Sequence, residues 1–589
     1  MKKTIFLLAV AFLLQKVMFS QCPNYLQFTS QEQVDNFLIE YPDCTEINNT
    51  VSISGDQITN LNGLINITSI GQDLIIGSTS VLNDLTGLDN LSYVGGNLSI
   101  IETSGLSSLH GLNSLLAIQG YARFDYNETL TSLSELSSLT SVGQTLYINF
   151  NTNLSSIGMF NLEGNIQSLY LESNPQLLNL IGLEKITSIT EDAYIVDNAS
   201  LASLMGLNNL DSVGFALTIR NNPPLQNLEG LNNLRVVELF LTISNNENLS
   251  SLTGLESLST IHYTLYILNN PSLSHLTGLT GLNNIDADLD IYDNIALIDL
   301  TGLENLMYTT KSITIAGNNT LSSLTGLESL THIEQHINIL NNISLTSLNG
   351  LENLDTIVGN FNILYNPALT ELTEFNDLRC ILGELEFTGN YALQSLNGFT
   401  KLNSLGLGLK INQCNSLINM IGLDSLRSVG GILHINENNA LESLDGLDQI
   451  DPESITQLRI TNNPHLSKCE IQTICDFLAG PNENITIYVN APGCNNSSEI
   501  EYECLVSSEE TDYQDNITLY PNPVSNDLFF SCNNGLEIKS IRLYNQFGQN
   551  FQFGKPIQQS INVSGMQAGL YVVEIESNGQ LSRQKLMIY

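Results

Sequence analysis

Apolar and polar residues recur along most of the chain in a unit of 24 residues. In the copy that begins at Gly254, the apolar positions are Leu255, Leu258, Ile261, Leu265, Ile267, Leu273 and Leu276, and the next copy begins at Gly278. Positions equivalent to Gly254 are 63, 87, 111, 135, 159, 182, 206, 230, 254, 278, 302, 326, 350, 374, 398, 422 and 446, and all but Glu135, Met159 and Glu374 are glycine. A fixed period of this length predicts a solenoid of about 17 coils rather than a globular core.

The spacing within a unit predicts the shape of each coil. Leu265 and Ile267 are two residues apart, so they face one side of a short strand while Tyr266 faces the other side. One unit cannot bury its leucines alone, and therefore neighbouring coils must stack and pair their strands in parallel. We expect an all-β fold, a right-handed parallel β-solenoid, over residues 45–468.

An asparagine occupies the same place in 14 of the 17 units. These residues are Asn127, Asn151, Asn174, Asn198, Asn222, Asn246, Asn270, Asn294, Asn318, Asn342, Asn366, Asn390, Asn438 and Asn463. An amide side chain donates and accepts hydrogen bonds at once, so stacked copies can satisfy one another and the backbone of the bend that leaves the strand. We interpret this row as architecture rather than as a ligand site.

The repeat resembles a known family in its details. The pattern Leu-x-Ile-x-x-Asn, the intervening Leu-x-Gly-Leu and the closing sequence NPHLSKC at residues 463–469 are similar to the receptor L domain, a relative of the leucine-rich repeat. The apolar residue before the strand lies four places from it, as Ile261 does from Leu265, where an ordinary leucine-rich repeat has three. The resemblance implies an L-domain-like coil over residues 45–505.

Composition and charge limit the partners. The 589 residues carry 60 acidic and 19 basic side chains, a formal net charge of -41. Such an excess of negative charge argues against nucleic acid and anionic membrane surfaces as partners. Because 42% of the residues are hydrophobic, the acidity does not indicate disorder.

The N-terminal residues have the form of a secretory signal peptide. Lys2 and Lys3 precede an apolar run at residues 5–14, and less apolar residues continue to Ser20, after which we place the cleavage. A lipoprotein with Cys22 as the lipidated residue is a weaker alternative, because Gln21 stands where a small residue is usual. No later apolar run is long enough to span a bilayer, so no transmembrane segment is expected in the mature chain.

Cysteines at both ends of the repeats predict disulfide-linked caps in an oxidising compartment. Cys22 and Cys44 bracket an N-terminal cap at residues 21–44 that contains a short helix. Cys469, Cys475, Cys494 and Cys504 define a C-terminal cap at residues 469–504, and their three possible pairings remain open. Their spacing does not match a zinc module. We leave Cys380, Cys414 and Cys532 unpaired.

The chain changes character after the repeats. Residues 505–516 are acidic and lack apolar periodicity, which indicates a linker. Strand patterns follow at residues 517–520, 528–530, 538–544 and 570–575, separated by Pro, Asn and Gly. Residues 517–589 are therefore predicted to form a small antiparallel β-sandwich.

This last segment resembles the type A C-terminal sorting domain of the type IX secretion system of Bacteroidota. The residues that carry the resemblance are Tyr520, Pro521, Asn522, Pro523, Val524, Tyr544, Gly548, Gly569, Leu570, Tyr571, Val572 and Lys585. The resemblance implies that the type IX machinery is a partner. It also implies export across the outer membrane, followed by release or attachment to the cell surface.

No pattern of catalytic residues is found in the repeats. The seven histidines fall at different phases of the unit and hence on different faces, and no phosphate-binding glycine loop is present. An enzyme needs groups that converge on a pocket. We therefore expect a protein that is not an enzyme and that uses neither a cofactor nor a metal ion.

Two stripes of side chains are candidates for binding. The outward strand position holds Arg123, Tyr147, Tyr170, Tyr194 and Tyr266. Aligned tyrosines can hold a protein or glycan partner, although Tyr also suits exposed strands in general. The second stripe, two residues after the glycine position, comprises Asp89, Glu184, Glu256, Glu304, Glu328, Glu352, Asp424 and Asp448. It forms either a solvated acidic edge or a calcium site.

These observations predict an exported repeat protein, secreted or attached to the outer-membrane surface, whose solenoid presents a binding face for adhesion or capture. A structural spacer or surface-layer component without a specific ligand is the alternative.

Overall fold

The computed structural model describes residues 22–23, 25–158, 161–372, 375–507, 517–532, 537–545, 547–556, 559–577 and 580–589. The predicted signal peptide at residues 1–20 lies outside the described residues, as do Met159 and Glu374. The chain divides into two compact units, residues 1–330 and 331–589, which are described separately. Together they hold about 19 turns of a parallel β-solenoid.

Each turn of the first unit contributes one strand of three or four residues to a parallel sheet. These strands are β1 (Leu26–Phe28), β3 (Val51–Ile53), β5 (Leu74–Gly77), β7 (Leu98–Ile101), β9 (Ala122–Asp125), β11 (Leu146–Asn149), β13 (Leu169–Glu172), β15 (Ala193–Val196), β17 (Leu217–Arg220), β19 (Leu241–Ser244), β21 (Leu265–Leu268), β23 (Leu289–Tyr292) and β25 (Ile313–Ala316). Leu265 pairs with Leu241 on one side and with Leu289 on the other, so equivalent residues stand in register. The predicted parallel pairing of the coils is confirmed.

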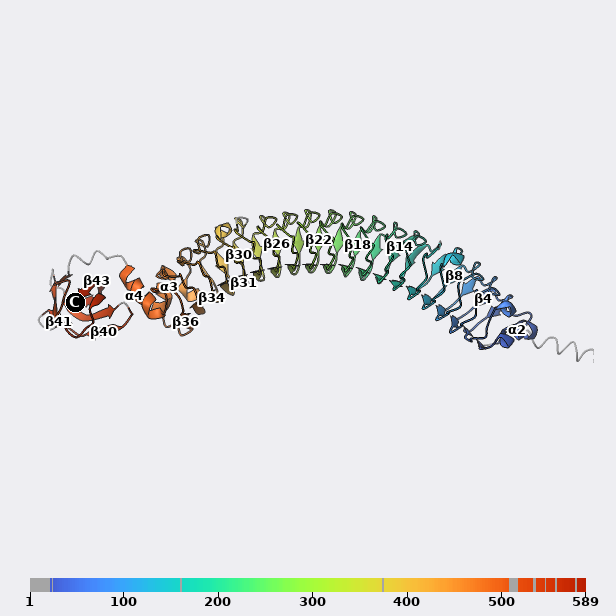
Figure 1. Cartoon of the computed structure of the whole chain (residues 1–589), viewed down its shortest axis with the longest axis horizontal. Helices are drawn as coiled ribbons and strands as arrows, with labels where there is room; N and C mark the ends of the chain where they lie inside the picture. Colours follow the sequence, from blue (N-terminus) through green and yellow to red (C-terminus); the bar gives the residue numbers. More distant parts are fainter. Residues whose placement is uncertain are drawn as a thin grey trace, which may run out of the picture. The chain divides into compact units, whose positions relative to one another are not determined.

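From β2 onward a second strand, of two residues in most turns, precedes the longer strand, and the sequence did not predict it. These strands are β2 (Glu46–Ile47), β4 (Ser69–Ile70), β6 (Tyr93–Val94), β8 (Ala117–Ile118), β10 (Ser141–Val142), β12 (Gly164–Ile166), β14 (Ile186–Ile189), β16 (Ser212–Val213), β18 (Val236–Val237), β20 (Thr260–Ile261), β22 (Asn284–Ile285) and β24 (Tyr308–Thr309). Ten of these twelve strands have only two residues, which are too few for an alternating pattern to be visible in the sequence. Figure 1 shows the labelled members from β4 to β22 stacked one after another.

The interior of each turn is filled by the leucines of the repeat. Leu255, Leu258, Ile261, Leu265 and Ile267 are all fully buried, and so are their equivalents in the neighbouring turns. Burying one such side chain contributes about 1.5–3 kcal/mol relative to its exposure. The core is therefore a continuous column of leucine and isoleucine that successive turns share.

Glycine at the corner is required by both conformation and space. Gly254 has φ +112°, and a Cβ atom there would lie 2.1 Å from the carbonyl oxygen of Leu228 in the preceding turn. In η2 (Ser134–Leu136) the corner is a short 3-10 helix and Glu135 has no positive φ, so this corner tolerates a side chain. The exception at Glu135 thus reflects a different corner geometry.

The N-terminal cap contains the predicted helix and an additional strand. Helix α2 (Gln31–Glu40) begins at Ser30, whose side chain accepts from the Gln33 backbone in a capping box. Val34 and Phe37 are buried, and β1 extends the parallel sheet by pairing with β3.

The second unit continues the two-strand turns as far as β33, and its last three turns each contain a single strand. Its longer strands are β27 (Ile337–Leu340), β29 (Phe361–Leu364), β31 (Glu384–Thr388), β33 (Gly408–Asn412), β34 (Ile432–Asn436), β35 (Gln457–Thr461) and β36 (Ile485–Tyr488). Its shorter strands are β26 (His332–Ile333), β28 (Thr356–Ile357), β30 (Cys380–Ile381) and β32 (Ser404–Leu405). Strand β36 pairs with β35 inside the predicted C-terminal cap. The spacing from Leu458 to Ile485 is longer than the repeat period, and therefore the period alone missed this last strand.

Two helices complete the C-terminal cap. Helix α3 (Gln472–Ala479) covers the last turn, since the Thr473 hydroxyl donates to the carbonyl oxygens of Leu447 and Ile450. Helix α4 (Ser497–Ser507) follows. It extends three residues into the segment that the sequence analysis assigned to the linker, and residues 508–516 lie outside the described part.

Residues 517–589 form two small antiparallel sheets around one core. One sheet contains β37 (Ile517–Tyr520), β38 (Asp527–Cys532) and β41 (Ser560–Asn562), and the other contains β39 (Ile538–Asn545), β40 (Asn550–Phe553), β42 (Gly569–Ser577) and β43 (Gln580–Ile588). Side chains from both sheets, among them Leu528, Phe530, Ile541 and Val573, pack into a common buried cluster. The four strands predicted from the sequence are confirmed.

Among the described residues, the structure has no helix with the length and apolarity needed to cross a membrane.

Candidate functional site

Aromatic side chains gather on the outward side of four consecutive turns of the first unit. We call this set the aromatic patch and define it as Tyr121, Arg123, Tyr126, Tyr147, Phe150, Tyr170 and Tyr194. Strands β9, β11, β13 and β15 position Arg123 and the three tyrosines of the row, because their inward residues are locked in the leucine core and the intervening residues face outward. Tyr121 precedes β9, and Tyr126 and Phe150 follow β9 and β11. The parallel register then places Arg123, Tyr147, Tyr170 and Tyr194 in one row.

The three tyrosines of the row stack on one another. The ring centroids of Tyr147 and Tyr170 are 5.1 Å apart with an interplanar angle of 18°, and those of Tyr170 and Tyr194 are 5.1 Å apart at 10°. Tyr121 meets Tyr147 edge to face at 5.9 Å. Because the rings turn their faces toward one another, the row offers ring edges and hydroxyl groups rather than one flat aromatic surface.

The Arg123 guanidinium lies at one end of the tyrosine row. The Arg123 guanidinium carbon lies 4.9 Å from the centroid of the Tyr147 ring, within the range of a cation–π contact. Arg123 also forms an ion pair with Asp125, with 2.6 Å between Nε and Oδ2. Burial raises the pKa of the Asp125 carboxyl, and the Arg123 charge opposes that shift.

The hydroxyl groups of Tyr170 and Tyr194 stay protonated at neutral pH. Partial burial, followed by the nearby Asp192 carboxylate, raises the pKa of Tyr170 to about 12. The same two causes raise the pKa of Tyr194, while Arg220 lowers it in part. A neutral tyrosine can donate as well as accept a hydrogen bond, so the row suits a partner with polar groups of either kind.

Two further aromatic residues occupy strained corner positions next to the row. Tyr126 and Phe150 have φ +55° and +59°, in the left-handed region that bulky residues rarely adopt. Their rings stack at 4.6 Å with an interplanar angle of 3°, and Tyr126 is 48% exposed. Together with Pro175 and Asp197 they line a shallow groove of about 370 Å³. The positive φ recurs at this corner in the neighbouring turns, as at Ser173, Asp197 and Asn221, so the backbone conformation belongs to the solenoid and the aromatic rings are what distinguish these two turns.

The structure brings together four of the five predicted stripe residues. Arg123, Tyr147, Tyr170 and Tyr194 lie side by side, whereas two threonines, Thr218 and Thr242, separate Tyr266 from them along the sheet. Tyr266 instead stacks on Phe240, with 6.2 Å between ring centroids.

Sequence reasoning missed Tyr126 and Phe150. Their signal was present in the repeat, because the residue before the ladder asparagine is small or polar in most turns, as at Ser173, Asp197 and Asn221. Two aromatic residues at this corner in consecutive turns depart from that rule. Only the positive φ at the corner shows why the departure matters.

The acidic stripe has a structural role inside each turn. At each of its eight positions the carboxylate accepts a hydrogen bond from the N–H of the corner glycine two residues earlier, as Glu304 does from Gly302 at 2.9 Å. Asn113, Asn208 and Asn232 do the same in their turns. This bond explains the acidic residue at these positions without a calcium ion. Within the described part of the chain, no cluster of three or more His, Cys, Asp or Glu could hold a metal ion.

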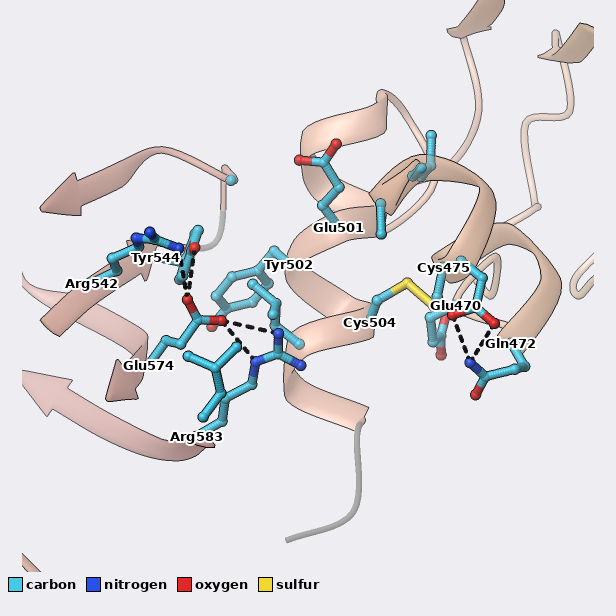
Figure 2. Close-up of a pocket in the computed structure, with 16 residues that line it drawn as sticks. Glu470, Gln472, Cys475, Glu501, Tyr502, Cys504, Arg542, Tyr544, Glu574 and Arg583 are labelled. Atoms are coloured by element: carbon cyan, nitrogen blue, oxygen red, sulfur yellow. Dashed lines mark hydrogen bonds and ion pairs between the residues drawn. A yellow bond between two sulfur atoms is a disulfide. The ribbon is translucent and has the colours of Figure 1, made fainter. Parts of the chain in front are cut away.

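All six predicted disulfide cysteines are paired. The bonds are Cys22–Cys44 in the N-terminal cap, and Cys469–Cys494 and Cys475–Cys504 in the C-terminal cap. Figure 2 shows the last of these joining α3 to α4. Cys380 and Cys414 are free, as expected, and the Cys532 side chain lies outside the described part.

The residues that resemble a sorting motif divide between two places on the C-terminal domain. Tyr520, Pro521, Asn522 and Pro523 form an exposed turn after β37, and the Asn522 side chain joins this turn to β43 through the Lys585 carbonyl oxygen and the Met587 N–H. Gly548 occupies a tight turn with φ +70°. Gly569 begins β42, and the buried Tyr571 donates its hydroxyl to the Gln567 carbonyl oxygen at 2.9 Å.

The C-terminal domain matches a known protein family. Residues 518–589 match the model of the family described as the secretion system C-terminal sorting domain. No curated protein matches the chain. The C-terminal part of the chain is therefore similar to sorting domains. That similarity indicates delivery by the type IX secretion system to a secreted or cell-surface location.

Proposed function

We propose that this chain is an exported, non-catalytic repeat protein whose aromatic patch binds a protein or glycan partner outside the cell. A cleaved signal peptide and the type IX machinery deliver it, and it acts in adhesion or capture. Its repeats belong with the receptor L domain, and its source is a member of the Bacteroidota.

The observation that carries the proposal is the concentration of aromatic residues on four adjacent turns. Other turns of the first unit place Thr218 and Thr242 at the outward strand position, and Asn221 and Asn245 at the strained corner. The solenoid therefore does not require aromatic residues at either position. Tyrosine supplies a large contact area and a hydrogen-bonding group with little loss of conformational entropy, which suits it to recognition surfaces.

The geometry favours a partner held by both hydrogen bonds and apolar contact. The stacked row presents hydroxyl groups and the Arg123 charge, while the Tyr126 and Phe150 corner presents the apolar side of the groove. Stacking within the row fixes the rings before the partner arrives, so less side-chain entropy is lost on binding.

The test combines Tyr147→Ser, Tyr170→Ser and Tyr194→Ser in the full chain. Binding to a panel of immobilised glycans and purified extracellular-matrix proteins is measured by surface plasmon resonance. We expect the triple variant to weaken binding to the panel member that wild type binds by roughly 30-fold or more, the loss of one or two hot-spot residues. The matched control combines Tyr93→Ser, Tyr266→Ser and Tyr308→Ser, which lie outside the aromatic patch, and we expect no change.

Equal loss in both triple variants, or unchanged binding in the patch variant, contradicts the proposal. If wild type binds no member of the panel and only a second copy of itself, the spacer or surface-layer function is supported instead. Circular dichroism of each variant checks that the solenoid is intact.

A further inference from the structure

Helix α4 of the C-terminal cap is buried on two opposite sides. Ile500 and Cys504 are four residues apart and share one face, on which Ile500 is fully buried and Cys504 is bonded to Cys475 of α3. Tyr502 projects from the opposite face and is also buried, with 4% exposed. A helix at the end of a chain segment needs only one buried face to cover a solenoid, so the second face has another neighbour.

That neighbour is the sorting domain. Figure 2 shows the Tyr502 ring pointing toward the strands of this domain and lying beside Arg583. The Tyr502 hydroxyl donates to the Leu570 carbonyl oxygen of β42 at 3.4 Å. The turn at Gly548 lies against the start of α4 so closely that an added Cβ would be 2.3 Å from the Ser498 carbonyl oxygen.

The two sides also carry opposite charge. The cap contributes Glu470, Asp476 and Glu501 to a cavity of about 1010 Å³, and the sorting domain contributes Arg542 and Arg583. These two arginines share the single Glu574 carboxylate, so one net positive charge remains on the sorting-domain side. Burial and the like charge of Glu470 raise the pKa of Glu503, whereas Lys585 of the sorting domain lowers it.

We propose that the C-terminal cap is a docking surface for the sorting domain of its own chain, and that helix α4 makes the contact. The cap covers the side of the sorting motif that contains Gly548 and Leu570, and it leaves the exposed turn at Tyr520–Pro523 open. The two parts of the motif then have different tasks. The open turn faces the secretion machinery, and the covered side attaches the domain to a folded, disulfide-linked cap.

Hydrogen–deuterium exchange on the full chain tests this assignment from both sides of the contact. Gly548→Asn keeps the turn, because Asn tolerates a positive φ, but its side chain collides with the Ser498 carbonyl. We expect exchange in α4 to rise by roughly tenfold in this variant, since the helix loses the packing on its second face. Tyr502→Ala is expected to raise exchange in the turn at residues 547–549 in the same way.

Two controls separate docking from general damage. Gly554→Asn changes a glycine of the same domain that has open space around it, and Tyr520→Ala removes an aromatic ring from the open turn. Both should leave the exchange of α4 at the wild-type rate. The strands of the sorting domain and β35 of the solenoid should be unchanged in every variant.

If the Gly548→Asn effect stays within the sorting domain while α4 exchanges as in wild type, the docking proposal is overturned. A second measurement uses Cys475→Ser with Cys504→Ser, which frees α4 from α3. Docking predicts faster exchange at residues 547–549 in this variant. Unchanged exchange there means that the cap does not hold the domain.

Discussion

Single buried asparagines decide how one turn is joined to the next. The Asn270 side chain donates to the Ile243 carbonyl oxygen of the preceding turn at 3.0 Å and accepts from the Asn246 N–H at 3.1 Å. Its own N–H donates to the Asn294 side chain at 3.0 Å. In one turn Cys414 replaces the asparagine, yet the Cys414 N–H still donates to the Asn438 side chain. Burial raises the pKa of the Cys414 thiol to about 12, so this cysteine stays protonated and unreactive.

Replacing one asparagine of this row tests how much the row contributes to the free energy of unfolding. We expect Asn270→Ala to lower the free energy of unfolding by about 3 kcal/mol, because the Asn246 N–H and the Ile243 carbonyl lose their partner without access to water. Asn305→Ala removes an exposed bond to the Thr280 carbonyl oxygen and should cost less than about 1 kcal/mol. Guanidinium unfolding followed by circular dichroism compares the two, and equal costs would show that the row does not stabilise the turns.

The strands determine which outward side chains are buried. Asp290 on β23 stands in register between Tyr266 and Thr314, so its neighbours cover much of it. This burial and the nearby Asp288 raise the pKa of Asp290 from 3.8 to about 6. On a strand without paired neighbours, the Asp290 carboxyl would be solvated and burial would not raise its pKa. The raised pKa is therefore a consequence of the pairing of β23 with its neighbours in the sheet.

The shift of Asp290 predicts a pH dependence. A raised pKa in the folded state means that the folded chain binds the proton more tightly than the unfolded chain, so Asp290 destabilises the fold increasingly as pH rises from about 4 to about 6. Asp290→Asn removes this penalty. We expect the variant to melt at a higher temperature than wild type at pH 7 and to lose that advantage at pH 4. A difference that is the same at both pH values would contradict the shift.

The repeat makes the whole molecule tolerant of changes in length. Within each unit a turn pairs with the turns before and after it, and equivalent residues take equivalent places. In such proteins stability is approximately a sum of the repeats and their interfaces.

Removing one full repeat should therefore leave the fold intact. Deleting residues 255–278 joins Gly254 to Leu279, which has the same place as Leu255, and Asn246 then meets Asn294 in place of Asn270. We expect the shortened chain to keep the β-type circular dichroism and a cooperative melt close to that of wild type. Deleting only residues 255–266 puts polar residues into the leucine column and should prevent folding. Similar behaviour of the two deletions would show that the turns are not interchangeable.

Local patterns were sufficient for most of the architecture. Leucines every 24 residues predicted the solenoid, because no single turn can bury them, and the asparagine row was visible by its spacing alone. The cysteines marked both caps, and residues 517–589 showed alternating strands. The short strands and β36 were not predictable, since two residues contain no alternation and the cap breaks the period.

The functional surfaces depended on what the fold brings together. The amino-acid sequence by itself determined which residues face outward, because alternation along a strand follows from local geometry. Only the tertiary structure decided that Tyr126 and Phe150 stack at strained corners, that the acidic stripe binds the corner glycines, and which cap cysteines pair. It also decided that Tyr502 is covered by the sorting domain. Each of these depends on distances between residues far apart in the chain, which packing sets and spacing alone does not contain.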